Sequence, residues 1–207
     1  APTTTSHTVD DFADYFRKKV NTIRQTTVHA EPAVISDRIC SRLSAFDDVT
    51  VEELTKIVNN SPTKHCELDP APTWLVKRVL PFLAPVFVKL CSLSFHEGVF
   101  LGVLKDAVVR PRIKKPTLDP DDVSSYRPIS NLSFLSKLVE RVVASRLSVH
   151  IDSQQLLPEK QSAYRARHST ETAVIAVHDE IVKAVDFGGV CALVLLDLSA
   201  AFYTVDH

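Results

Sequence analysis

The sequence predicts a mixed α/β (α+β) fold in which helices dominate and strands are few. Apolar residues recur at the spacing of an amphipathic helix in residues 10–24, 132–151 and 170–185. Residues 107–115 and 190–198 are instead rich in Val, Ile and Leu over the length of a strand. Hydrophobic residues make up 45% of the 207 positions and charged residues 24%, a balance typical of a globular chain that buries a core.

The N-terminal region predicts two helices between irregular stretches. Residues 1–9 are rich in Thr, and we expect them to be disordered. The helix over residues 10–24 is followed by a patternless linker to about residue 50. A short helix is expected from Thr50 to Asn60, because Thr50 with Glu53 three positions later has the capping-box pattern.

The middle of the chain predicts a helical pair followed by an edge strand. Helices are expected at about residues 73–80 and 82–97, with Gly98 ending the second. Residues 107–115 read as a strand, and Pro111 restricts it to the edge of a sheet because proline donates no ladder hydrogen bond. Residues 116–125 form an acidic loop rich in turn residues.

The C-terminal part predicts two helices and one buried strand. The helix over 132–151 has the clearest apolar stripe. A basic segment over 155–168, either a loop or strand-like, separates it from the helix over 170–185. Gly188 and Gly189 turn the chain into residues 190–198, which we expect to be a buried strand. Asp197 lies near the end of this strand, where a carboxylate either binds a cation or caps the following turn.

Composition excludes several classes of protein. No apolar run approaches the roughly 20 residues of a membrane-spanning helix, so we expect no membrane partner. The four cysteines are far apart and lack a C-x-x-C pair, which favours free thiols in a reducing compartment over a disulfide or zinc framework. His65 beside Cys66 supplies at most half of a metal site and is better explained as a surface pair.

The formal net charge of −1 conceals a basic block followed by an acidic one. Residues 105–170 contain twelve basic and seven acidic residues, a net charge of +5. Residues 171–207 contain one basic and six acidic residues, a net charge of −5. This order suits a track for a polyanion that leads to a metal-binding carboxylate, but the charges alone favour the simpler interpretation of two solvated faces with compositional drift.

Four ordered segments resemble the reverse transcriptase domain of LINE-type, jockey-like retrotransposons. Residues 195–207 (LLDLSAAFYTVDH) resemble the first catalytic motif of that family. Upstream, residues 104–111 (LKDAVVRP) resemble the segment entering the fingers, and residues 126–132 (YRPISNL) and 161–170 (QSAYRARHST) resemble two fingers motifs. The resemblance covers roughly residues 66–207, and residues 68–75 (LDPAPTWL) are similar to the region preceding the domain.

The resemblance implies a right-hand polymerase of which the fingers and the first part of the palm are present. Residues 1–65 would be an N-terminal helical and linker region, 66–104 a helical region before the fingers, and 105–207 the incomplete reverse transcriptase domain. Template-directed DNA synthesis from RNA is the implied activity, with an RNA template, a DNA primer and dNTPs as partners. An intracellular location, nuclear or cytoplasmic, is implied in the same way.

The resemblance also assigns roles to individual residues. Asp197 would be the first catalytic, metal-binding carboxylate for Mg²⁺, and Phe202 would exclude the 2′-hydroxyl of an incoming nucleotide. Arg165 and Arg167 would lie near the triphosphate and template, where guanidinium groups bind phosphate oxygens well. Three further basic residues would attract nucleic acid, namely Lys114, Lys115 and Arg127. For Arg127 an internal acidic residue is the alternative partner.

Two departures from the family pattern and one missing element limit the expected activity. Tyr203 stands where the family usually has Asp, and Ala163-Tyr164 stands where it usually has Gly-Phe. The sequence contains no Tyr/Phe-x-Asp-Asp turn, which supplies the second set of metal ligands. We therefore expect the chain alone not to polymerise. Alternatives to a polymerase segment are a non-catalytic nucleic-acid-binding remnant and a non-functional relic of a mobile element.

Overall fold

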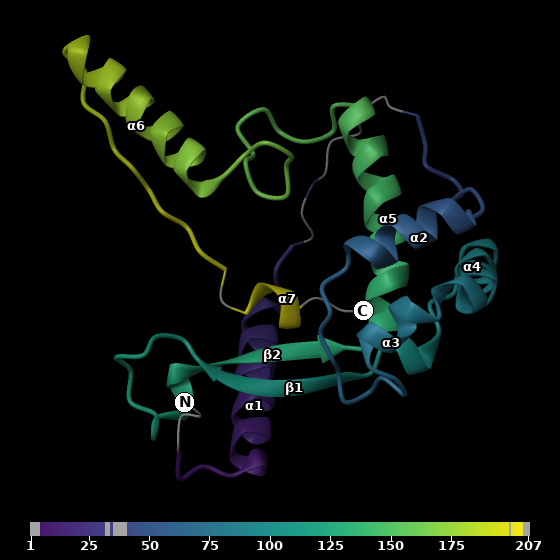
Figure 1. The fold of residues 1–207 in the computed structure, drawn as a ribbon. Helices are drawn as coiled ribbons and strands as arrows, with labels where there is room; N and C mark the ends of the chain where they lie inside the picture. The colour runs from purple at the N-terminus through teal and green to yellow at the C-terminus, as the bar shows by residue number, and fades with distance from the viewer. Residues whose placement is uncertain (1–4, 32–33, 35–40, 199, 205–207) are drawn as a thin grey trace. The chain divides into compact units, whose positions relative to one another are not determined.

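The computed structural model describes residues 5–31, 34, 41–198 and 200–204, and the chain divides into two units, residues 1–150 and 151–207 (Figure 1). Predictions for residues 1–4, Ser199 and Asp206 fall outside the described residues. The described helices and strands confirm a mixed fold in which a small sheet accompanies several helices. In order they are α1 (Val9–Thr27), α2 (Val51–Asn60), α3 (Thr73–Arg78), α4 (Leu80–Glu97), β1 (Ala107–Ile113), β2 (Tyr126–Leu132), α5 (Phe134–Ser153), α6 (Thr170–Asp186) and α7 (Ala201–Thr204).

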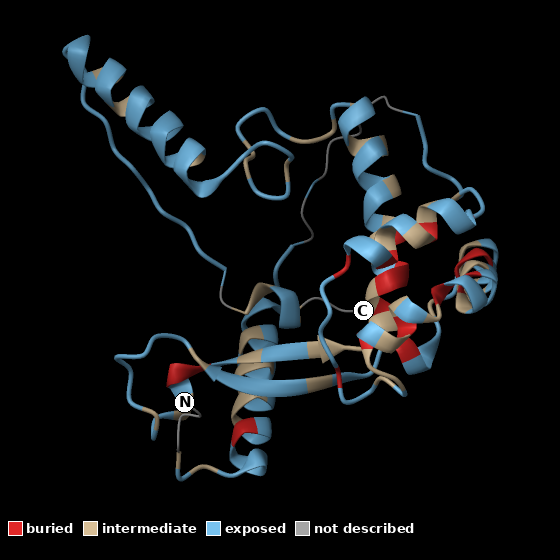
Figure 2. Cartoon of the chain, in the orientation of Figure 1, coloured by how far each residue is buried: buried red, intermediate tan, exposed pale blue. Residues whose placement is uncertain are grey.

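The core of the first unit lies among helices α2, α4 and α5. Figure 2 shows the buried positions gathered on the facing sides of these helices. Helix α5 contributes Leu138, Val139 and Val142, each at most 1% exposed, which confirms the apolar stripe that its sequence predicted. The residues that they join in this cluster are Val49, Leu54, Val58, Leu80, Ala84, Cys91 and Leu104. Burial raises the pKa of the Cys91 thiol to about 11, so this cysteine stays protonated and packs as an apolar group.

The ends of these helices follow their local sequence. The Thr50 hydroxyl accepts the Glu53 N–H at 3.1 Å and caps α2, as expected. The Glu53 carboxylate does not complete the capping box, because it pairs with Arg146 instead. Gly98 ends α4 in the left-handed conformation at φ 65°, which glycine adopts without a steric penalty.

Arg146 connects three segments around the core. Its guanidinium donates to the backbone carbonyls of Asp47 and Asp48, the second at 3.1 Å, and binds the Glu53 carboxylate at 2.9 Å. The same group lies 5.4 Å from the centre of the Phe95 ring on α4. Arg146 is only 18% exposed, so these contacts tie the 41–50 segment, α2 and α4 to α5 in a partly desolvated setting.

Strands β1 and β2 form a two-stranded antiparallel sheet, with Ala107 opposite Leu132 and Ile113 opposite Tyr126. Strand β1 confirms the predicted edge strand, whereas β2 was not expected, because Pro128 within it discourages a strand assignment. Both strands are edges of this sheet, and Pro111 lies directly opposite Pro128. Each proline therefore occupies a position that an edge strand tolerates.

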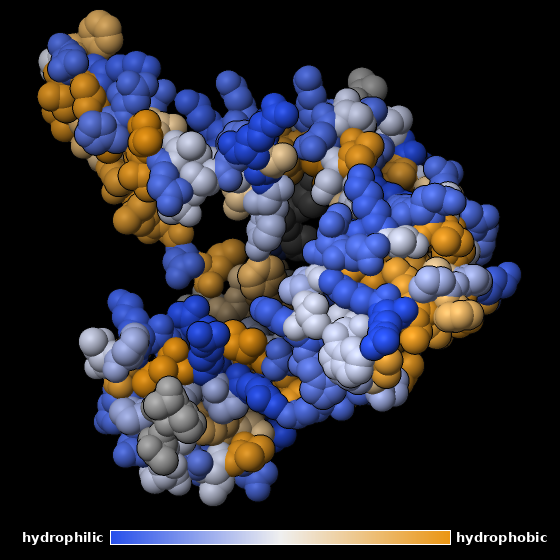
Figure 3. Space-filling model, viewed as in Figure 1, coloured by the Kyte–Doolittle hydropathy of each residue, from blue (hydrophilic) through white to orange (hydrophobic). Residues whose placement is uncertain are grey.

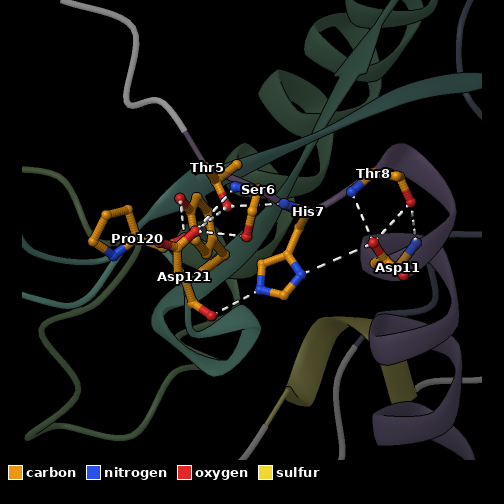
Figure 4. Close-up of polar contacts among 8 residues, drawn as sticks. Thr5, Ser6, His7, Thr8, Asp11, Pro120 and Asp121 are labelled. Atoms are coloured by element: carbon orange, nitrogen blue, oxygen red, sulfur yellow. Dashed lines mark hydrogen bonds and ion pairs between the residues drawn. The ribbon is translucent and has the colours of Figure 1, made fainter.

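Helix α1 crosses one face of this hairpin, and residues 5–8 attach it there (Figure 4). The expectation that residues 1–9 are disordered is wrong for this described part. The Phe12 ring packs against the Tyr126 ring with centroids 4.8 Å apart. Ser6 donates from its backbone and its hydroxyl to the Asp121 carboxylate, each at 2.9 Å, and these bonds hold the pKa of that carboxyl below its usual value. His7 contacts the Asp121 carbonyl at 2.8 Å.

The described residues of the second unit include no buried position, in contrast to the first unit. Helix α6 confirms the predicted helix and begins at a Ser169 capping box with Thr172. Several of its apolar residues are more than half exposed, among them Val174, Ile175 and Val185. Figure 3 shows hydrophobic surface along this helix. This unit therefore has no hydrophobic core of its own within the described residues.

The prediction of a buried strand over residues 190–198 is wrong for the structure described. The segment has no assigned strand or helix, and Leu195 and Leu196 are 85% and 93% exposed. An isolated strand leaves its backbone N–H and C=O groups without ladder partners, so it forms only beside another strand. The sheet of the described residues contains β1 and β2 alone, and neither pairs with this segment.

In the part of the chain that the structure describes, no helix is long and apolar enough to cross a bilayer.

Replacing Arg146 by Met tests the role of its contacts. We expect Arg146→Met to lower the free energy of unfolding by about 1 to 3 kcal/mol, because several hydrogen bonds to a partly buried cation are lost together. Urea unfolding followed by circular dichroism measures the change. The matched control is Arg17→Met on α1, whose pair with Asp14 is 68% and 77% exposed and whose loss should cost under about 0.5 kcal/mol. Equal effects of the two changes would refute the assignment.

The exposed segment 190–198 should drive self-association of the isolated chain. A long run of apolar residues that is interrupted by a single charge, Asp197, and has no ladder partners pairs readily with a second copy of itself. We expect Leu195→Lys to reduce thioflavin binding and the fraction of large species in analytical ultracentrifugation. Phe82→Lys, at an 83% exposed position on α4, is the control and should change little. Self-association that persists in Leu195→Lys and disappears in Phe82→Lys would contradict this.

Candidate nucleic-acid interface

One face of the β1–β2 hairpin collects basic side chains. Successive side chains of a strand point to opposite faces, so Arg110, Arg112 and Lys114 share one face, and the register adds Arg127 to it. Tyr126 and Ile113 point to the other face, which packs against α1 through Phe12. The hairpin is therefore two-sided, with an aromatic side covered by α1 and a basic side.

Arg112 and Arg127 lie directly opposite each other in the register, and both are exposed. Directly opposed residues of antiparallel strands have Cβ atoms about 5 Å apart, and like charges at such positions repel. In the described part of the chain neither forms an ion pair, whereas the neighbouring Arg110 binds Glu67. The sequence left open that Arg127 pairs with an acidic residue of the chain itself, and the described residues contain no such pair. An anion bound between Arg112 and Arg127 would relieve their repulsion.

Lys114 and Lys115 follow β1 and are exposed. The Lys114 ammonium donates to the Ser124 carbonyl at 2.7 Å, and its charge contributes to the lowered pKa of Asp122, whose largest cause is the Ser124 hydroxyl. Lys114 thus has local partners that compete with an outside anion, whereas Lys115 has none recorded in the described structure. This favours Lys115 over Lys114 as a general attractor of phosphate.

Arg165 and Arg167 lie in the 155–168 loop of the second unit. The Arg165 guanidinium is half-buried and donates to the carbonyls of Glu159 at 3.0 Å and Pro158 at 3.4 Å. It lines an open pocket of about 680 Å³ together with the acidic residues Asp152 and Glu159. Two carboxylates in this pocket oppose the approach of a triphosphate, so phosphate binding by Arg165 stays a prediction.

Backbone strain accumulates in the same loop. Gln155, Tyr164 and Arg167 adopt positive φ angles of 52°, 60° and 64°, a region that residues other than glycine rarely enter. Tyr164 follows the position where the related family has glycine, and its ring is 89% exposed. The loop thus holds Arg167 outward on strained backbone, a feature that clusters at ligand-binding segments.

Asp197 lies in the extended, exposed segment rather than at the end of a buried strand. Its carboxylate has neither an ion pair nor a hydrogen bond recorded in the described structure, so it is free to meet an outside cation. The described residues contain no group of three or more His, Cys, Asp or Glu side chains that could enclose a metal ion. A single exposed carboxylate supplies one ligand where Mg²⁺ requires six, so the described residues do not by themselves fit a magnesium site.

Phe202 follows on the short helix α7 and is 74% exposed, while Tyr203 beside it is 38% exposed. The Ala200 carbonyl accepts the Tyr203 N–H at 2.9 Å and fixes this turn. Neither Asp197 nor Phe202 belongs to the residues that line the Arg165 pocket. The described second unit therefore does not bring the predicted nucleotide-binding residues into one enclosed site.

Sequence reasoning missed Arg112, which the structure places opposite Arg127. The alternation of Arg110, Arg112 and Lys114 at intervals of two was the available signal, since a period of two puts side chains on one face of a strand. The sequence did not predict strand β2, and without β2 nothing indicates that Arg127 lies opposite Arg112.

Comparison with known proteins finds a family and several relatives that match this chain. Residues 113–207 match the family described as reverse transcriptase (RNA-dependent DNA polymerase). The chain is 32% identical over 159 residues, 77% of its length, to a probable RNA-directed DNA polymerase from transposon BS of Drosophila melanogaster, covering 18% of that relative. It is 37% identical over 134 residues to a probable RNA-directed DNA polymerase from transposon X-element of Drosophila melanogaster, covering 64% of this chain and 14% of the relative.

A third relative is the RNA-directed DNA polymerase from mobile element jockey of Drosophila melanogaster, 29% identical over 163 residues, which are 77% of this chain and 17% of the relative. The chain thus spans less than a fifth of the length of these curated relatives. The matched residues 113–207 include all the predicted site residues, from Lys114 to Phe202. Residues 113–207 therefore belong to the reverse transcriptase family, and the chain is a segment similar to the transposon-borne RNA-directed DNA polymerases.

Proposed function

We propose that this chain is the fingers region and the first palm segment of a polymerase that copies RNA into DNA. The observation that carries this proposal is the family match over residues 113–207, which includes Asp197, Phe202 and the basic residues together. The proposed divisions are an N-terminal helical and linker region over 1–65, a helical region over 66–104 and the reverse transcriptase domain from 105 onward. An RNA template, a DNA primer and dNTPs are the proposed partners.

In this proposal Asp197 is one of several ligands of Mg²⁺. The metal would supply positive charge against the phosphates at which DNA synthesis takes place. The remaining ligands must come from other residues, because the described chain offers no further carboxylate at Asp197. Segment 190–198 becomes a strand when a partner strand covers it, and its exposed apolar side chains are the physical reason to expect such a partner.

Phe202 and Arg165 have proposed roles in recognising the nucleotide. An exposed ring five residues after the metal-binding carboxylate can lie against the sugar and leave no room for a 2′-hydroxyl. Arg165 retains unused N–H groups beyond the two carbonyls that it binds, and these suit phosphate oxygens. Arg167, held outward at a positive φ, is the second proposed phosphate contact.

The hairpin supports nucleic-acid binding independently of catalysis. Arg112 and Arg127 repel each other across the strands unless an anion lies between them. A backbone phosphate meets this requirement, and Lys115 adds a third positive charge after β1. This observation also favours the second candidate function, a non-catalytic segment that binds RNA, because it needs none of the metal ligands.

Primer extension tests the polymerase proposal. In the longest reading frame that contains this sequence, we expect Asp197→Asn to reduce Mg²⁺-dependent extension on a primed RNA template by at least about a thousandfold. Phe202→Ala should retain extension with dNTPs and gain extension with rNTPs. The 207-residue chain alone should extend nothing. Extension by that chain, abolished by Asp197→Ala, would show that one carboxylate element suffices and would overturn the expectation that the chain alone is inactive. Extension by the longer protein that Asp197→Asn leaves unchanged would overturn the polymerase proposal.

Salt-dependent binding tests the hairpin. We expect Arg112→Gln and Arg127→Gln each to weaken binding of single-stranded RNA and to lower the slope of log affinity against log salt by about 1. Either change should leave the free energy of unfolding equal or slightly higher at low salt, since it removes the repulsion between opposed charges. The control Arg17→Gln on α1 changes the same charge outside the hairpin. Equal slopes for all three variants would exclude this face as the binding site.

A further inference from the structure

We propose that the open pocket between α2 and α5 binds a phosphate group. It has a volume of about 460 Å³ and lies within the first unit, apart from the basic face of the hairpin. Lys56 and Asn60 line it from α2, and Arg141 and Ser145 line it from α5. Ile57 is the one apolar residue among its described lining residues, and the others carry polar or charged groups that could bind a charged ligand.

The charges that line this pocket are predominantly positive. Lys56 and Arg141 form no ion pair within the described part of the chain, and Lys56 is exposed. The one acidic lining residue, Glu53, is bound by Arg146 at 2.9 Å and is therefore compensated. Two uncompensated cations that share one pocket repel each other, and an anion between them removes that repulsion.

Arg141 is held in position for such an anion. Its Nη1 donates to the Ser61 hydroxyl, and that hydroxyl donates in turn to the Ile57 carbonyl at 2.7 Å. Ser61 is 5% exposed, so the residue that anchors Arg141 is buried, and Arg141 itself lines the pocket. Four of the five N–H groups of Arg141 remain available, and their fork geometry matches phosphate oxygens.

Helix capping does not explain Arg141. A cation at the C-terminus of α2 would be expected to bind the free carbonyl groups there. Lys77 already does so, because its ammonium binds the carbonyls of Asn59, at 3.0 Å, and of Ser61. Arg141 bonds to a side-chain hydroxyl instead, so it is not one of the groups that cap these carbonyls, and it lines the pocket.

The donors identify the class of ligand. A guanidinium, an ammonium, an amide NH₂ and a hydroxyl are all hydrogen-bond donors, and together they suit a tetrahedral oxyanion. The phosphate has two possible sources, a nucleic-acid backbone or a free phosphate ion or nucleotide. The pocket does not depend on polymerase activity, since none of its residues belongs to the proposed catalytic or hairpin sites.

Titration with inorganic phosphate tests the pocket in the full chain. We expect phosphate to shift backbone amide resonances of residues 56–61 and 141–145 in two-dimensional NMR spectra. Lys56→Gln and Arg141→Gln should each weaken the affinity by about tenfold, as the loss of one charge-assisted contact does. Lys56 makes no recorded contact, so its variant should fold normally even if Arg141→Gln does not. Lys18→Gln on α1 is the charge-matched control and should bind phosphate unchanged.

A parallel titration with a single-stranded RNA oligonucleotide separates the two sources. Weaker RNA binding by Lys56→Gln, with Lys18→Gln unaffected, identifies a backbone phosphate as the ligand. Loss of inorganic phosphate binding alone identifies a free phosphate or nucleotide. Phosphate shifts that are absent, or that persist unchanged in both Lys56→Gln and Arg141→Gln, overturn the proposal. Arg112→Gln should leave these shifts in place, so a failure of the hairpin site and a failure of this pocket are distinguishable.

Discussion

An apolar surface must be covered before a chain can hold its shape, and helix α5 meets this requirement for the first unit. Leu138, Val139 and Val142 on one stripe complete the core with α2 and α4. Arg146, one turn further along, binds the carbonyl groups of the 41–50 segment, which has no regular structure and therefore carries free backbone acceptors. One helix thus supplies both the apolar cover and the polar anchor, and the proposed phosphate pocket depends on the same placement of α5 against α2.

The second unit lacks such a cover within the described residues. Its residues have the same apolar character, since 190–198 is among the most hydrophobic stretches of the chain, yet none of its described positions is buried. Burial of a Leu or Val side chain contributes roughly 1.5 to 3 kcal/mol, so several such residues left in water represent a large unmet driving force. The chain spans less than a fifth of the length of these relatives, and the partner strand proposed for segment 190–198 would supply the missing cover.

The sequence predicted the helices well because their signals are local. The cap at Thr50, the Gly98 stop and the stripe on α5 depend on neighbours within a few residues. Strands depend on distant partners, which explains both errors. Residues 126–132 became a strand despite Pro128 because β1 lies beside them, and 190–198 did not because no described strand does. Candidate site residues also divide into those with local signals and those that depend on distant partners. Arg127 was proposed from its sequence motif. Arg112 became a candidate only through the strand register, and Arg141 only through the packing of α5 on α2.

The distribution of charges along the chain gains a physical meaning from these positions. The first unit contains two separate places where cations occur together with no uncompensated acid among the described residues. Arg112 lies opposite Arg127 across the hairpin, and Lys56 and Arg141 line one pocket between two helices. Asp197, by contrast, stands in an acidic stretch with no cation bound to it in the described structure. Opposed cations attract phosphate, and a lone exposed carboxylate attracts a metal ion. Other exposed charges are paired locally, as Arg110 is with Glu67 and Lys160 with Glu180. The proposed contacts with phosphate and with metal therefore rest on different groups, the opposed cations of the first unit and the exposed Asp197, and they can be tested separately.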